Sequence, residues 1–148
     1  MNHIEQKLKD LELTLPALTS SKGIYKRCLS VGNLVYVSGH VSVVTGKLGR
    51  ELDEEEGAFA ARQCGLAMLA ALKNHLGDLD RIKRVVKLLG MVNSVEDYEK
   101  HPLVINGCSA LFAQLWGDEN GIGVRSAVGM GSLPGNVAVE IEGIFELV

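Results

Sequence analysis

Arg125, Glu140 and Glu142 stand among small and apolar residues in the stretch GVRSAVGMGSLPGNVAVEIEGIFELV, residues 123–148. Charges are costly to bury unless they are paired, so each of these groups faces either water or a charged ligand. An arginine can hold a carboxylate through a planar, bidentate pair. A carboxylate beside a water molecule can orient it and take up its proton. The residues alone leave two interpretations open: these charges meet a charged ligand, or they are solvated surface charges.

The elements that must position these residues follow from hydrophobic periodicity and from glycine and proline signals. An acidic first turn opens the longest helical run at Asp53, and Gly77 ends it. In the last strand, alternation places Glu140 and Glu142 on one face and Val139 and Ile141 on the other. The full pattern predicts a helix at 3–12 ahead of Pro16, two strands within 24–44 joined at Gly32-Asn33, a helix at 53–77, a strand at 81–93, a helix at 102–116 stopped by Gly117, and a strand at 136–144.

This order, a helix followed by β-β-α-β-α-β, predicts an α+β fold with helices packed on one face of a sheet. At 148 residues the chain has the length of one domain, so we expect a single domain over 1–148 with residues 1–16 as an N-terminal helical extension. No further helices remain to cover the second face of the sheet. Self-association is therefore a physical expectation.

Composition disfavours several classes of function. The net charge is -3, aromatic residues make up 5%, and Lys and Arg do not cluster beyond RIKR, so we expect no nucleic-acid partner. No apolar run approaches the roughly 20 residues of a membrane span, and the start MNHIEQKLKD is charged where a signal peptide would be apolar, so we expect a cytoplasmic protein. Cys28, Cys64 and Cys108 are odd in number and far apart, which favours reduced thiols and predicts no metal site.

The segment RSAVGMGSLPGNVAVEIEGI, together with GNLVYVSGH in the second predicted strand, resembles the signatures of the reactive intermediate deaminase family, also called Rid or YjgF-like. The resemblance extends from Gly23 to Leu147. It implies a chorismate-mutase-like β-β-α-β-α-β fold on a mixed sheet and a homotrimer whose three clefts lie between subunits. The N-terminal helix and GRELDEEEG are similar to one branch of this family.

Position by position, the resemblance implies that Arg125 binds the substrate carboxylate and that Glu140 lies near the attacking water. The residues that it implies as the lining of the cleft are Tyr25, Ser38, Gly39 and Asn106.

Two positions depart from the family pattern. Ala127 stands where deaminating members often have cysteine, and it can still supply backbone groups. His40 stands where glutamine is common, and it either alters substrate choice or has a structural role.

The resemblance implies hydrolysis of reactive enamines or imines from amino-acid metabolism to 2-oxo acids and ammonia, without a cofactor. The partner would be a small carboxylate-bearing imine or enamine. The alternative is a non-catalytic trimer that binds a small carboxylate metabolite as a sensor or as a regulatory partner. Turnover distinguishes the two, because both require ligand binding through Arg125.

Overall fold

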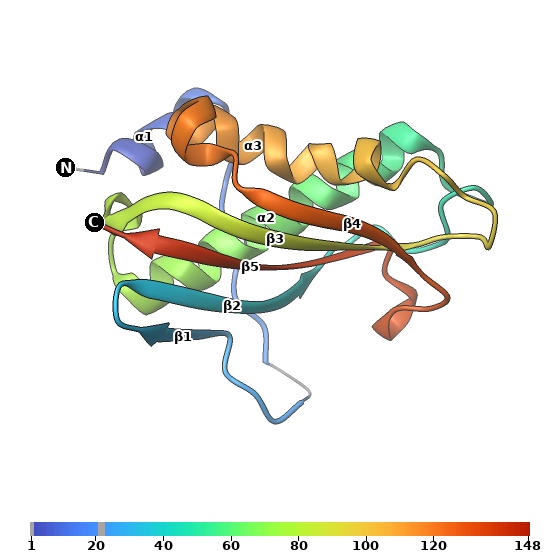
Figure 1. Ribbon diagram of the computed structural model, residues 1–148, viewed down its shortest axis with the longest axis horizontal. Helices are drawn as coiled ribbons and strands as arrows, with labels where there is room; N and C mark the ends of the chain where they lie inside the picture. The colour runs from blue at the N-terminus through green and yellow to red at the C-terminus, as the bar shows by residue number, and fades with distance from the viewer. Residues whose placement is uncertain (1, 21–22) are drawn as a thin grey trace.

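The computed structural model describes residues 2–20 and 23–148, and these form helices layered on a five-stranded sheet (Figure 1). The α-helices are α1 (His3–Asp10), α2 (Glu54–Leu76) and α3 (His101–Gly121), and two short 3-10 helices are η1 (Leu79–Arg81) and η2 (Pro134–Asn136). The strands are β1 (Cys28–Val31), β2 (Leu34–Val41), β3 (Ile82–Asn93), β4 (Val124–Met130) and β5 (Val139–Leu147).

The sheet is mixed, with strand order β1-β2-β5-β3-β4. The pairs β1/β2, β2/β5 and β3/β5 are antiparallel, whereas β3/β4 is parallel. The α+β class and the mixed sheet with helices on one face are confirmed. The predicted order lacked one strand, β4. The segment has glycine at positions 123, 129 and 131, at and around its ends, and glycines are typical of turns. It forms a strand because it pairs with β3.

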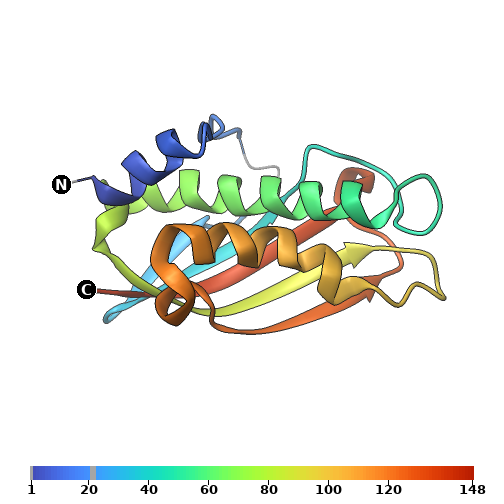
Figure 2. The same cartoon turned by 90° about the horizontal axis from the view of Figure 1, so that it is seen from above.

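Helix α2 lies against one face of the sheet beside α3, as Figure 2 shows from above. Its start is a capping box, in which Glu56 N donates to Asp53 Oδ1 at 2.8 Å and Asp53 N donates to Glu56 Oε1 at 3.0 Å. The two helices approach closely where α3 has glycine. A Cβ on Gly107 would overlap the backbone carbonyl of Ala58, so a larger residue does not fit there.

The predicted stop at Gly117 is a break in α3. Gly117 has φ 80°, outside the helical region, and a short helical segment continues to Gly121. Helix α1 is attached to the body of the protein through Asp80, whose carboxylate accepts from His3 N at 2.8 Å and Ile4 N at 2.9 Å. Ile4 and Leu8 of α1 are buried in the common core.

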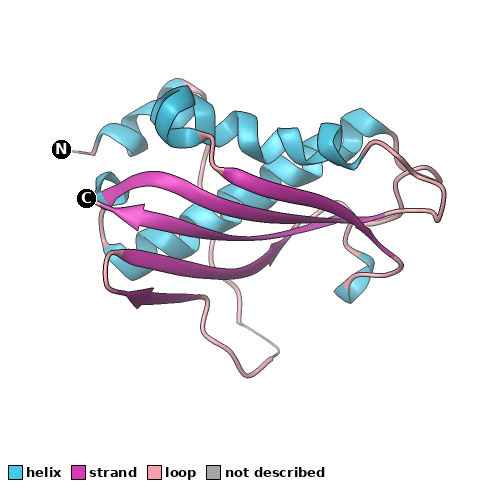
Figure 3. Ribbon diagram, in the orientation of Figure 1, coloured by secondary structure: helices cyan, strands magenta, loops and turns pink. Residues whose placement is uncertain are grey.

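On the second face of the sheet, residues 2–20 and 23–148 place no helix (Figures 1 and 3). Cross-strand register places apolar side chains of several strands on this face, because directly paired residues point the same way. Six of them are exposed: Leu29, Val31, Tyr36, Val41, Val124 and Val128. We call this the open face. Among the described residues, no helix has the length and apolar character needed to cross a membrane.

Candidate functional site

Arg125 lies on β4 and points toward the helix layer. It is paired with Leu88, a buried residue of β3 whose side chain contributes to the core, so the two share the helix side of the sheet. The guanidinium donates from Nη1 to Ser109 Oγ at 3.0 Å and from Nη2 to the carbonyl of Pro102 at 3.1 Å. Both acceptors belong to α3. Arg125 is therefore half-buried against a helix, and the expectation of a freely solvated arginine is corrected.

Asn106 and Ala127 lie beside Arg125. Pro102, Asn106 and Ser109 are spaced by four and three residues, which puts them on one side of α3, and Arg125 contacts the first and the last. Asn106 is exposed on this stripe. Ala127 is two residues from Arg125 on the same side of β4, opposite Gly90. Arg125, Asn106 and Ala127 thus form one cluster, which we call the Arg125 cluster.

Glu140 lies on the other side of the sheet. It is paired with exposed Val41 on β2 and with Met91 on β3, and it points to the open face. Gly39 of β2 lies directly against it, because a Cβ on Gly39 would overlap a carboxylate oxygen of Glu140. The glycine at this position therefore makes room for the carboxylate.

Burial among these neighbours raises the pKa of the Glu140 carboxyl above its usual value, and the nearby charge of Glu142 raises it further. The shift moves its proton equilibrium toward neutrality, where a general base or acid works best. Glu142, expected to be solvated, is exposed on the same face.

Ser38 precedes Gly39 on β2, and two hydrogen bonds join it to the segment before β1 that also contains Tyr25. The amide of Ser38 donates to the carbonyl of Arg27 at 2.8 Å, and its hydroxyl donates to the carbonyl of Lys26 at 2.5 Å. Tyr25 is 53% exposed on that segment and is not in a strand, which corrects the strand expected there. We call Glu140, Gly39, Ser38 and Tyr25 the Glu140 cluster.

His40 faces the helix layer. It is paired with buried Ile141 across β2 and β5, after an irregularity in the register between Val37 and His40. Only 7% of the residue is exposed, and Nδ1 lies 2.7 Å from the carbonyl of Ser38. A carbonyl only accepts, so Nδ1 carries the proton of this bond. Burial lowers the pKa of the His40 imidazole, so the ring is neutral at pH 7 and is separated from the Glu140 carboxylate by the sheet.

The structure therefore groups the predicted residues into two clusters instead of one. The Arg125 cluster lies on the helix side of β4, and the Glu140 cluster lies on or beside the open face of β5 and β2. Ser109, which the sequence patterns did not single out, contacts Arg125 directly. Its position three residues after Asn106, on the same helical stripe, was a signal available in the sequence.

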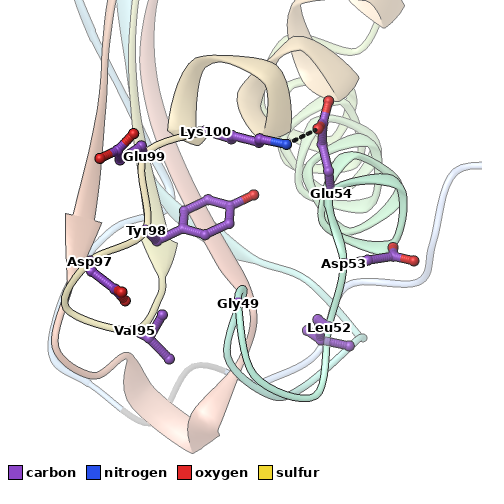
Figure 4. Close-up of a pocket in the computed structure, with 9 residues that line it drawn as sticks. All are labelled: Gly49, Leu52, Asp53, Glu54, Val95, Asp97, Tyr98, Glu99 and Lys100. Atoms are coloured by element: carbon purple, nitrogen blue, oxygen red, sulfur yellow. Dashed lines mark ion pairs between the residues drawn. The ribbon is translucent and has the colours of Figure 1, made fainter.

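A surface hollow of about 340 Å³ lies elsewhere, between the loop before α2 and the loop before α3 (Figure 4). Four carboxylates line it, those of Asp53, Glu54, Asp97 and Glu99, against one ammonium from Lys100. Glu54 Oε2 lies 3.7 Å from Lys100 Nζ. This excess of negative charge disfavours a carboxylate or phosphate ligand there, and none of the predicted site residues lines the hollow.

Potential metal ligands do not gather in the described parts of the chain, where no group of three or more His, Cys, Asp or Glu side chains could hold an ion. Cys28, Cys64 and Cys108 are free thiols and are buried. Burial raises the pKa of the Cys28 thiol to about 11 and that of Cys108 to about 12, so both are protonated at neutral pH. Their chemistry is accordingly that of small core residues.

Comparison with known proteins finds a matching family and a similar protein. Residues 5–139 match the family described as "YjgF/chorismate_mutase-like, putative endoribonuclease". Protein TCP17 of Trypanosoma cruzi is 38% identical over 146 residues, which cover 95% of this chain and 91% of that protein.

Two solved structures extend the comparison. Atu1372 of Agrobacterium tumefaciens, a protein with unknown function, is 43% identical with a TM-score of 0.90, over 99% of this chain and 94% of that one. RidA of an Antarctic Psychrobacter is 26% identical with a TM-score of 0.56, over 86% of this chain and 92% of that one.

Proposed function

Because the chain belongs to the YjgF/chorismate-mutase-like family, we propose that it hydrolyses reactive enamines or imines of amino-acid metabolism to 2-oxo acids and ammonia. The proposal rests on the unused hydrogen-bond donors of the Arg125 guanidinium, and the raised pKa of the Glu140 carboxyl on the other side of the sheet supports it. Arg125 has five N–H groups, and two of them donate to α3. Five minus two leaves three N–H groups without a hydrogen-bond partner among the described residues, enough for a bidentate pair with a substrate carboxylate.

The proposed chemistry adds water across a C=N bond. Arg125 binds the carboxylate of the 2-imino acid and fixes the orientation of the adjacent imine carbon. Glu140 accepts a proton from water as the water oxygen bonds to that carbon, and returns this proton to the nitrogen to give a carbinolamine. Glu140 then takes the proton of the new hydroxyl and passes it to the nitrogen as the C=O bond forms and the C–N bond breaks. The products are a 2-oxo acid and ammonia. No electrons are transferred, so the scheme requires no redox cofactor.

A single subunit does not bring the two clusters together, and we propose that a homotrimer does. The clusters lie on opposite sides of the sheet, so one cleft that uses both needs residues from two copies. The exposed apolar side chains of the open face support association, because a patch of this kind on a small protein commonly marks an interface. Glu140 lies on that face, so association would place its carboxyl at the boundary between two subunits.

The remaining cleft residues keep supporting roles in this proposal. Asn106 offers an amide beside Arg125, Ala127 offers backbone groups, and Ser38, Gly39 and Tyr25 shape the side near Glu140. His40 acts through its bond to the Ser38 carbonyl, which holds the backbone next to Gly39. We place the protein in the cytosol, which the three free, buried thiols support because that compartment keeps cysteines reduced.

A second candidate is a non-catalytic trimer that binds a small carboxylate metabolite as a sensor or regulatory partner. Ala127 favours this candidate, because it stands where deaminating members of the family often carry a thiol. An assay that generates 2-aminoacrylate or 2-iminobutanoate in situ tests both. If the protein accelerates formation of the 2-oxo acid, it is an enzyme. Binding of the 2-oxo acid without acceleration would support the sensor instead.

A further inference from the structure

Arg125 is held by α3 at two points that are seven residues apart in the chain. One is the hydroxyl of Ser109 at 3.0 Å, and the other is the carbonyl of Pro102 at 3.1 Å. The carbonyl is part of the backbone and is present whatever the side chain. The hydroxyl is a side-chain group that a single substitution can remove. Of the two contacts that hold Arg125, only the one to Ser109 can therefore be removed by substitution of a side chain.

The two contacts restrict the guanidinium in a definite way. Each takes one N–H, from Nη1 and from Nη2 respectively, so the plane of the group is set by two acceptors on one helix. An unsupported arginine loses rotamer freedom when a ligand immobilises it. When the free protein already orders the side chain, a ligand does not bear that cost at binding.

Ser109 itself has no other hydrogen bond through its side chain among the described residues. It is half-buried on the stripe of α3 that carries exposed Asn106. A helical serine commonly bonds a carbonyl one turn back, whereas this one accepts from an arginine on a neighbouring strand. Its contact joins the helix to the residue that would bind substrate.

We propose that Ser109 is a positioning residue, which pre-orders Arg125 for a small carboxylate. This inference rests on the function proposed above and adds the residue that tunes its substrate affinity. Loss of the hydroxyl leaves the charge of Arg125 in place but releases one end of the guanidinium. The expected result is weaker binding of the carboxylate with an unchanged preference for a carboxylate over an uncharged analogue.

The test compares Ser109→Ala, Ser109→Thr and the control Ser132→Ala. Ser132 is exposed after the end of β4 and away from α3, so its substitution removes the same hydroxyl without touching the guanidinium. The probe is 2-oxobutanoate, titrated into the full-length protein by calorimetry. Nitrogen NMR of the Arg125 side chain records its mobility without ligand, and rescue of both affinity and mobility by Ser109→Thr is the readout that a role in packing alone would not produce.

We expect Ser109→Ala to weaken 2-oxobutanoate binding by roughly 5- to 10-fold and to mobilise the Arg125 side chain, the loss expected for one charge-assisted hydrogen bond that remains partly solvated. Ser109→Thr keeps the hydroxyl and should stay within about 2-fold of the wild type, like Ser132→Ala. Equal affinity and equal Arg125 mobility in Ser109→Ala and the wild type would overturn the inference. Binding without turnover in the wild type would overturn the proposed hydrolysis and leave the role of Ser109 intact, so the two failures are distinguishable.

Discussion

Arg125 and Glu140 lie on opposite faces of one sheet, on strands β4 and β5 that are separated by β3. Adjacent strands are about 4.8 Å apart, so the two backbones are roughly 10 Å apart, and their side chains then diverge. The possibility that Glu140 is the structural partner of Arg125 within one chain is therefore excluded. Arg125 instead bonds to α3, and Glu140 packs against Gly39.

The first prediction concerns assembly. The protein should sediment at about three times its subunit mass of 15.9 kDa at micromolar concentration. Val128→Asp places a charge on the open face and should dissociate the trimer, because an unpaired charge is costly in a buried interface. Leu103→Asp is the matched control, since Leu103 is similarly exposed but lies on α3. A wild-type protein that stays monomeric at this concentration would contradict the proposed cleft between subunits.

Substitution of Arg125 should lower both the activity and the stability of the protein, because the same side chain would bind substrate and bonds to α3. Arg125→Ala loses the charge and both bonds to α3, so we expect kcat/KM to fall by roughly 100-fold and the free energy of unfolding to fall by about 1–2 kcal/mol. Arg125→Lys keeps the positive charge but cannot form a planar, bidentate pair with a carboxylate, so it should also lose activity. Chemical denaturation and the in situ imine assay measure the two effects. Full activity in Arg125→Lys would mean that no bidentate pair is formed.

The pH dependence of stability should reveal the raised pKa of the Glu140 carboxyl. Its pKa is raised in the folded protein, so its favourable contribution is present in full below the unfolded pKa of about 4.5 and is lost as pH rises through the folded pKa. Glu140→Gln should therefore be more stable than the wild type near pH 7, with the difference vanishing near pH 4, and it should be about 100-fold less active. Unfolding free energies across this pH range provide the measurement. A constant difference would show that the carboxyl is not perturbed.

Glu142 provides an independent check of the same electrostatics. Its charge is one of the two causes that raise the pKa of Glu140. Glu142→Gln should lower the pKa of Glu140, and the acid limb of the activity profile should shift to lower pH with it. If that limb does not move, a group other than Glu140 controls it.

Two glycines offer a matched pair of substitutions. Gly39→Ala would meet the end of a flexible side chain, the Glu140 carboxylate, which can move away, so we expect lost activity with less than about 1 kcal/mol of destabilisation. The new methyl group of Gly107→Ala would meet the backbone carbonyl of Ala58, which cannot move alone. We therefore expect the free energy of unfolding to fall by more than about 2 kcal/mol. Thermal unfolding of the two variants tests the contrast. Normal activity in Gly39→Ala would indicate that the position of the Glu140 carboxylate is unimportant.

Periodicity, charge and glycine signals in the sequence were sufficient for most of the fold. The acidic first turn after Asp53, the break at Gly117 and the hairpin turn at Gly32 are local features, and each depends on residues within a few positions. Strand β4 was missed because its strand character comes from pairing with β3, residues 82–93, which are distant in the chain. Local patterns do not contain that partner.

The types of the site residues were readable in the sequence, but their arrangement was not. Sequence alone identified a guanidinium and a carboxylate suited to a small carboxylate substrate, because residue type decides charge and hydrogen-bonding capacity. Only the tertiary structure decided that Arg125 rests on Ser109 and Pro102, that Gly39 makes room for Glu140, and that the two clusters face away from each other. Those relationships depend on strand order and register, and a shift of register by one residue would turn each side chain to the other face.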